Sequence, residues 1–384
     1  MQRTLIAIAV LVGACQAAPP ATPPPVAVLP SQSSIPSALP LPESTPAASL
    51  GPVPPGRILF MRSESDGGIE HYFTINSDGT DEREIYTAQG CGCAHWMADG
   101  SRVMSLGESG EDVWSLMTIR PDGSDRVVVP TPIKTLSLAV GATTLDGKWL
   151  AFNSWDNVVP SNAGLYIAHP DLTKLRLVVP LQEGINATEP FGVTPDGSKV
   201  VFFAETGKAA GMTHGGDVYV VNADGSHLRR LNPTGTKTGF IGPPVISLSP
   251  DGRKAAFAVA DDGVYVADLE TGDVTLLTNE AGIEWAVAWS PTGEWIAYSL
   301  NRGGVNAIQL IRPDGTEAHQ ISTKDGAGGD RWSAWSPEGT ALLLQRGASD
   351  RTDLWIMDIE GNYLGQVTHT LSSHGFYSWA PAPR

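Results

Sequence analysis

The sequence predicts an all-β protein, a β-propeller of about seven four-stranded blades, and three observations support this prediction. A unit of about 45 residues recurs along the 384-residue chain from Gly56 to the C-terminus. The chain contains 42 Gly and 30 Pro, a composition that suits many turns. No stretch has the pattern of a long amphipathic helix. Short strands that repeat at this period are typical of a propeller, whose blades are four-stranded sheets.

Six of the repeats contain a first turn, which joins the first strand to the second. In the fifth copy, Ser249-Pro250-Asp251-Gly252 has Ser, Pro and Gly at the positions that suit a type I turn. The strands expected in this copy cover residues 244–248, 254–259, 263–268 and 274–277. The six first turns are Met97-Ala98-Asp99-Gly100, Thr144-Leu145-Asp146-Gly147, Thr194-Pro195-Asp196-Gly197, Ser249-Pro250-Asp251-Gly252, Ser290-Pro291-Thr292-Gly293 and Ser336-Pro337-Glu338-Gly339.

A second turn joins the third strand to the fourth, and it occurs once more often than the first turn. The chain therefore enters the pattern inside a repeat, at residues 57–60. Residues 376–381 align with residues 332–337, so the missing innermost strand is expected at the C-terminus, closing the ring against the first blade. Six or eight blades remain alternatives if the weak third repeat is misassigned. The seven second turns lie at Asp78-Gly79, Asp122-Gly123, Pro170-Asp171, Asp224-Gly225, Thr271-Gly272, Asp314-Gly315 and Glu360-Gly361.

The N-terminus predicts export and a lipid anchor. One basic residue and a short apolar run lead to Val12-Gly13-Ala14-Cys15, which resembles a bacterial lipobox. Residues 1–14 are thus expected to be a lipoprotein-type signal peptide and Cys15 the lipidated residue; the alternative is an ordinary secretory signal. Residues 15–55 form a predicted disordered tether, with thirteen Pro and a single charged residue after Cys15. Residues 56–384 are predicted to form the propeller, which we expect to be extracytoplasmic and lipid-anchored to the bacterial cell envelope.

The charge of the chain argues against one class of partner, nucleic acid. It has 41 acidic and 25 basic residues, a formal net charge of −16. Nucleic-acid binding needs a basic surface, so we expect none. We expect a monomer that contacts the membrane only through its lipid.

The repeats resemble a known family. Trp289-Ser290-Pro291-Thr292-Gly293, followed by Ile296-Ala297-Tyr298 and Ile311-Arg312-Pro313-Asp314-Gly315, is similar to the WD-like repeats of the TolB-type propeller. The resemblance covers residues 56–384 and implies the fold; the same superfamily supplies the propeller of prolyl-oligopeptidase-type peptidases. Where periplasmic TolB has an α/β domain before its propeller, this chain has the lipobox and the tether, which argues against a literal role in the Tol–Pal system. The sequence also lacks the Gly-x-Ser-x-Gly motif of serine hydrolases.

Three residue patterns suggest chemistry but favour structural roles. Cys91-Gly92-Cys93-Ala94-His95 could place two thiols and an imidazole on one face of a strand. Because zinc normally needs a fourth ligand, a Cys91–Cys93 disulfide or plain packing of the two cysteines is favoured over metal or redox chemistry. The Asp residues of the second turns are expected to shape those turns rather than bind calcium. Trp96, Trp289, Trp335 and Trp379 recur at one position and are expected to pack between blades.

The starts of the innermost strands are the predicted binding site, because the central channel of a propeller opens there. Aromatic and charged residues gathered on a rigid scaffold favour recognition of a protein, peptide or envelope polymer, without catalysis, cofactor or metal. The alternative is a lyase or hydrolase acting on a glycan or small ligand, with Glu284, Asp330 and His374 as acid–base groups. A third hypothesis is a Tol-like envelope scaffold. The predicted mouth residues are Glu189, Glu284, Trp285, Asp330, Arg331, Trp332, His374 and Phe376.

Overall fold

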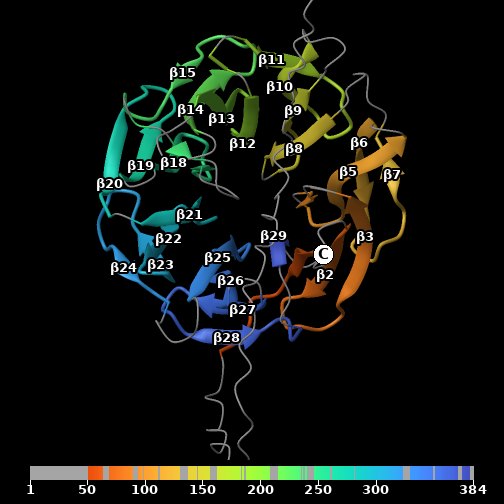
Figure 1. Cartoon of the computed structure of the whole chain (residues 1–384), viewed down its shortest axis with the longest axis vertical. Coiled ribbons are helices and arrows are strands. Elements are labelled where there is room, and N and C mark those ends of the chain that lie inside the picture. Colours follow the sequence, from red (N-terminus) through yellow and green to blue (C-terminus); the bar gives the residue numbers. More distant parts are fainter. Residues whose placement is uncertain are drawn as a thin grey trace, which may run out of the picture. The chain divides into compact units, whose positions relative to one another are not determined.

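Seven antiparallel sheets form a ring in the computed structural model of the chain, and each sheet is one blade (Figure 1). Residues Gly51–Arg384 form one compact unit. The blades have four strands each, and blade 4 has a further strand that pairs with its third. The structure describes residues 51–63, 69–89, 94–97, 99–110, 113–129, 137–144, 146–155, 162–182, 184–185, 187–207, 215–234, 236, 238–239, 246–259, 262–280, 282–322, 329–348, 351–370 and 374–380.

The strands run from the centre of the ring outward in chain order, except in blade 1. Blade 1 consists of β29 (His374–Ala380), β1 (Arg57–Ser63), β2 (Ile69–Asn76) and β3 (Arg83–Gln89). Blade 2 consists of β4 (His95–Trp96), β5 (Val103–Gly110), β6 (Val113–Ile119) and β7 (Val127–Val128). Blade 3 consists of β8 (Ser137–Thr143), β9 (Leu150–Trp155), β10 (Gly164–Ala168) and β11 (Arg176–Pro180). Blade 4 consists of β12 (Ala187–Val193), β13 (Lys199–Gly207), β14 (Gly215–Asn222) and β15 (Arg229–Arg230), with β16 (Thr238–Gly239) beside β14.

The remaining three blades complete the ring. Blade 5 consists of β17 (Ile246–Leu248), β18 (Lys254–Val259), β19 (Gly263–Asp268) and β20 (Val274–Thr278). Blade 6 consists of β21 (Ile283–Trp289), β22 (Ile296–Arg302), β23 (Val305–Ile311) and β24 (His319–Gln320). Blade 7 consists of β25 (Asp330–Trp335), β26 (Ala341–Ala348), β27 (Arg351–Asp358) and β28 (Tyr363–Gln366). The prediction of seven blades is confirmed. Among the described residues, no helix has the length and apolar composition needed to cross a membrane.

The C-terminal strand closes the ring, as the alignment of residues 376–381 predicts. β29 pairs with β1 in antiparallel register, with Ile58 opposite Trp379 and Leu59 opposite Ser378. The first blade therefore takes its innermost strand from the end of the chain and its other three strands from the beginning. This pairing covers an inner sheet edge that would otherwise be open.

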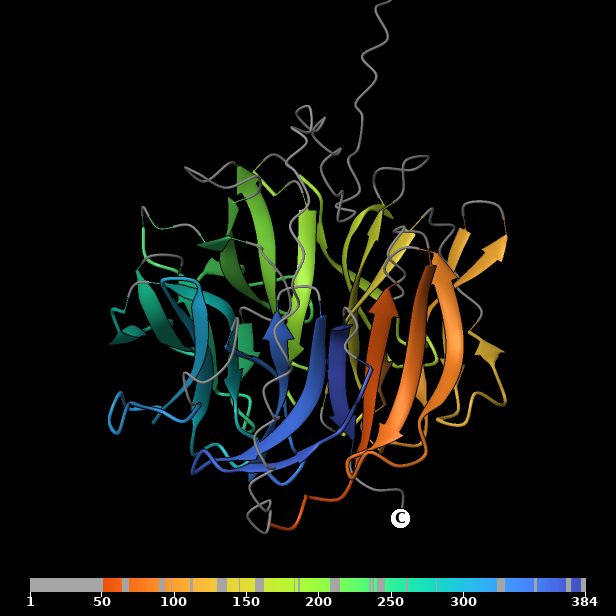
Figure 2. The same ribbon diagram turned by 60° about the horizontal axis from the view of Figure 1, so that its bottom comes forward.

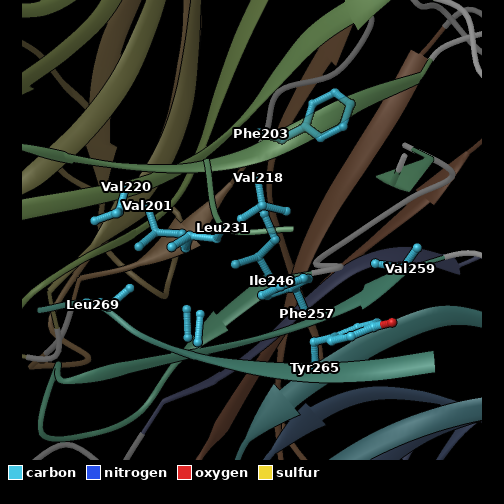
Figure 3. Packing of buried hydrophobic residues seen from close by; sticks show 12 residues of the cluster. Val201, Phe203, Val218, Val220, Leu231, Ile246, Phe257, Val259, Tyr265 and Leu269 are labelled. Carbon is cyan, nitrogen blue, oxygen red and sulfur yellow. The ribbon is translucent and has the colours of Figure 1, made fainter. Parts of the chain in front are cut away.

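The hydrophobic core is divided into seven clusters, and each cluster lies between two neighbouring blades. The cluster between blades 4 and 5, for example, joins Phe203 and Val218 of one blade to Phe257 and Tyr265 of the next (Figure 3). Trp96, Trp289, Trp335 and Trp379 each belong to such a cluster and are 7 or 8% exposed, so their predicted packing role is confirmed. Because each blade buries its two faces against its neighbours, the ring is a continuous packed scaffold.

The two kinds of turn lie on the same edge of the ring, which we call the turn edge. The opposite edge, where the innermost strands begin, is the mouth edge. In the second turns, the Asp carboxylate accepts a hydrogen bond of 2.6 Å from the hydroxyl of the Ser or Thr two residues later, at Asp78, Asp122, Asp171, Asp224 and Asp314. These bonds hold the pKa of each carboxyl below its usual range. The turn-forming role predicted for these aspartates is confirmed.

The chain enters the propeller at the turn edge. The Ser77 hydroxyl, in the second turn of blade 1, donates to the carbonyl of Pro54 at 2.7 Å. The Ser77 N–H donates to the carbonyl of Gly56 at 3.0 Å. Val53 packs against the core cluster between blades 7 and 1. Figure 2 shows these first described residues, in red-orange, along the lower rim of the ring.

Candidate functional site

The eight predicted mouth residues occupy the first three positions of four innermost strands. Glu189 is the third residue of β12, and Glu284 and Trp285 are the second and third of β21. β25 begins with Asp330, Arg331 and Trp332, and β29 contains His374 and Phe376 as its first and third residues. In Figure 1 these four strands lie around the centre of the ring. Among the eight residues, the structure describes the side chains of Glu189, Asp330 and Arg331.

Glu189 carries a carboxyl group with an unusual environment. It lies opposite Phe203 of β13, and cross-strand partners share a face, so its side chain points toward blade 5. Phe203 belongs to the cluster between blades 4 and 5 and marks one end of it in Figure 3. Burial raises the pKa of Glu189 to about 7. A group with this pKa exchanges protons near neutral pH.

Asp330 lies at the start of an innermost strand, as the alignment of repeats places it, and its side chain is buried. Its side chain is 1% exposed, and its carboxylate accepts a 2.5 Å hydrogen bond from the hydroxyl of Tyr363. The guanidinium of Arg346 lies 3.5 Å from the same carboxylate and 4.3 Å from the centre of the Tyr363 ring. Burial raises the pKa of Asp330 to about 6, although Arg346 opposes this effect. Asp330 therefore faces its own blade, where it links β25 to β26 and β28.

Arg331, next along β25, is partly buried and makes no ion pair with a described residue. Neighbouring residues of a strand point to opposite faces, so Arg331 and Asp330 diverge. Glu189 and Arg331 are thus the two described mouth residues whose charge is not already matched within the fold.

Tyr363 and Arg346 were not identified from the sequence. Tyr363 lies 33 positions after Asp330. Neither Tyr363 nor Arg346 belongs to a recognisable motif. The alignment of repeats places strands but does not show which side chains meet across a blade. Cys15, Cys91 and Cys93 lie outside the described residues, so lipidation and the disulfide stay predictions. Within the described part of the chain, no group of three or more His, Cys, Asp and Glu residues is arranged to hold a metal ion.

Comparison with known proteins agrees with the ring geometry. Residues 232–384 match the family model described as TolB beta propeller domain. The C-terminal part of the chain is thus similar to a TolB-type propeller. A TolB homolog of Chlorobium luteolum is 33% identical over 146 residues, which cover 37% of this chain and 31% of that protein. The matched segments span 21 to 50% of the length of the first curated relatives.

Solved structures with a similar propeller fold cover most of the chain. TolB from Acinetobacter baumannii is 14% identical with a TM-score of 0.51, and the match covers 85% of this chain and 67% of that one. An oligogalacturonate lyase from Vibrio parahaemolyticus is also 14% identical, with a TM-score of 0.54 and coverage of 79% and 91%. At these identities the likeness concerns the fold alone. The two named proteins have different functions although both contain a propeller, so the fold does not indicate which function this chain has.

Proposed function

We propose that this protein is a non-catalytic, extracytoplasmic binding lipoprotein whose mouth edge binds a protein, a peptide or an envelope polymer. In this proposal a lipid on Cys15 anchors a monomer, and residues 15–55 form the tether. The observation that carries the proposal is the entry of the chain at the turn edge, through the bonds of Ser77 to Pro54 and Gly56. The described entry segment, residues 51–56, therefore does not cover the mouth edge.

The charges at the mouth support binding there. Arg331 has no ion-pair partner among the described residues, and Glu189 has no hydrogen bond or ion pair with one. A partner that supplies complementary groups to these side chains gains charge-assisted hydrogen bonds. The rigid ring presents them without a large ordering cost, which favours affinity.

The test is capture of a partner from envelope extract by the immobilised full-length chain. We expect Trp285→Ala, Arg331→Ala and Trp332→Ala to lose a partner that the unmodified chain captures. Arg120→Ala is the matched control, because Arg120 is exposed at the turn edge. It should keep the partner. A partner bound equally by all four variants, each with an unchanged melting temperature, would contradict the assignment of the mouth.

The second candidate function is catalysis at the same mouth, and the environment of Glu189 favours it. A carboxyl with a pKa of about 7 can donate or accept a proton near neutral pH, as an acid–base group in a lyase or hydrolase must. This hypothesis predicts turnover of an oligosaccharide or a small ligand by the full chain, with loss of turnover in Glu189→Gln, Glu284→Gln or His374→Ala while partner capture persists. Unchanged turnover in all three variants would exclude it.

A further inference from the structure

A cleft lies at the turn edge between blades 2 and 3, on the edge of the ring opposite the mouth. Its volume is about 650 Å³, within the range of roughly 300–1,000 Å³ that is usual for small-molecule sites. Met97 and Arg102 line it from blade 2, and Trp149, His169 and Lys174 line it from blade 3. The cleft thus combines an aromatic ring with several cationic side chains.

Trp149 is held rigidly from the side of blade 4. Its indole packs against the core cluster between blades 3 and 4. A Cβ added at Gly197 would come within 2.2 Å of the indole nitrogen, so the absence of a side chain at Gly197 makes room for the ring. The imidazole of His169 meets the indole edge-on, with 4.6 Å between ring centres. A ring fixed in this way can serve as a stacking platform with little entropic cost.

Blade 6 shows what covers a tryptophan at the equivalent position. Trp295 immediately precedes the second strand of blade 6, and Trp149 immediately precedes that of blade 3. The guanidinium of Arg312 lies 3.8 Å from the centre of the Trp295 ring, which is 8% exposed. The sequence Arg312-Pro313-Asp314 corresponds to His169-Pro170-Asp171 in blade 3. His169 therefore takes the place of Arg312, and its ring plane stands at 70° to that of Trp149, whereas the guanidinium of Arg312 lies over the Trp295 ring.

Lys174 also departs from the pattern of the repeats. The left-handed residue that ends the second turn is acidic in blades 1, 2 and 6, at Asp81, Asp125 and Glu317. Each of these acids pairs with an arginine of its own blade, at 2.9, 2.8 and 3.3 Å. Lys174, with φ of 54°, occupies this position in blade 3. Its ammonium lies 5.8 Å from the centre of the Trp149 ring and makes no ion pair with a described residue.

Lys174 carries a positive charge in a protein that is acidic as a whole. The protein as a whole has a net charge of −16. Lys148 and Arg102 also line the cleft, but Asp146 and Asp125 already pair with them. Lys174 is therefore the cation in the lining that has no acidic partner among the described residues, and an anionic group on a ligand would supply one.

We infer that this cleft binds a carboxylate-bearing sugar ring, with the ring stacked on Trp149 and the carboxylate paired with Lys174. Polar groups of Thr118, His169 and Asp171 line the cleft around the aromatic platform. Thr118 and Asp171 already bond to Arg102 and Thr173, but their oxygens can accept further hydrogen bonds. Together with the imidazole of His169 they can bond the hydroxyls of a sugar, which a purely aromatic acid does not offer. The site is independent of the mouth, since it lies at the opposite edge of the ring.

The test compares glucuronate with glucose, which share a pyranose ring and differ in the carboxylate. Calorimetric titration of the full-length chain should show glucuronate binding at least about tenfold tighter than glucose. Lys174→Glu, which introduces the residue found in blade 6, should remove that preference. Lys254→Glu makes the same charge change at the start of the second strand of blade 5 and should leave binding unchanged. Arg331→Ala at the mouth should also bind glucuronate normally, whatever the function of the mouth.

His169→Arg separates stacking from simple charge attraction. The arginine should cover Trp149 as Arg312 covers Trp295, so glucuronate affinity should fall by at least about tenfold although the cleft gains positive charge. Tighter binding in this variant, equal affinity for glucose and glucuronate, or equally strong competition by inorganic phosphate would each overturn the sugar-acid assignment. The absence of glucuronate binding to the unmodified chain at about 10 mM would overturn it as well. Melting temperatures of all variants verify that they are folded.

Discussion

Glu189 provides the sharpest test of how the mouth is built. Its folded-state pKa of about 7 exceeds the ordinary value of 4.5 because burial disfavours the charged carboxylate. The folded protein therefore binds this proton more tightly than the unfolded chain does. The stability linked to Glu189 is complete below about pH 4.5, decreases as the pH rises from 4.5 to 7, and is constant above that range. Glu189→Gln replaces the carboxyl with a neutral amide of similar shape and removes this dependence.

The size of the effect follows from the same pKa. The difference between 4.5 and about 7 corresponds to about 3 kcal/mol of unfolding free energy at pH 8, as an upper bound. For a propeller of this size, that change raises the melting temperature by roughly 4 °C. At about pH 4, where the carboxyl is protonated in both states, the variant and the unmodified chain should differ little.

The assay is calorimetric unfolding of the full-length chain and of Glu189→Gln at about pH 4 and pH 8. Glu338→Gln is the control, because Glu338 is exposed in a first turn of blade 7. Its melting temperature should match that of the unmodified chain at both values. If Glu189→Gln lowers the melting temperature at pH 8, the ionised carboxylate stabilises the fold, and the explanation by burial is refuted.

Three further predictions concern the core and the anchor. Tyr363→Phe removes a hydrogen bond to the buried Asp330 carboxylate and should lower the unfolding free energy by about 1–3 kcal/mol, measured by urea denaturation at neutral pH. Trp335→Ala opens a cavity between blades 6 and 7 and should cost about 3–5 kcal/mol, whereas Leu276→Ala, at a side chain 46% exposed, should stay within about 0.5 kcal/mol. Cys15→Ser should move the protein from the membrane fraction to the soluble fraction of its host, and an unchanged distribution would contradict the lipid anchor.

The blades could be predicted because their turns depend on neighbouring residues. In the first turn of blade 5, Asp251 accepts hydrogen bonds from the Ser249 hydroxyl and the Arg253 N–H, all within five positions. Such local bonding requires particular residue types at fixed spacing, and the repeat is therefore visible in the sequence. Blade 3 is the weakest repeat because Leu172 stands where other second turns have Gly, and it adopts the left-handed conformation with φ of 59°.

The arrangement of the mouth depends on contacts between distant parts of the chain, and these could not be predicted. The position of Asp330 at the start of an innermost strand follows from the repeat, but its orientation depends on Tyr363, three strands away in the same sheet. The same alignment can nevertheless locate sites when equivalent positions are compared across blades. An arginine paired with an acid in blades 1 and 2 becomes Trp149 beside Lys174 in blade 3. Blades 1, 2 and 6 have an acid at the position of Lys174, and this departure in blade 3 supports the ligand site that we propose there.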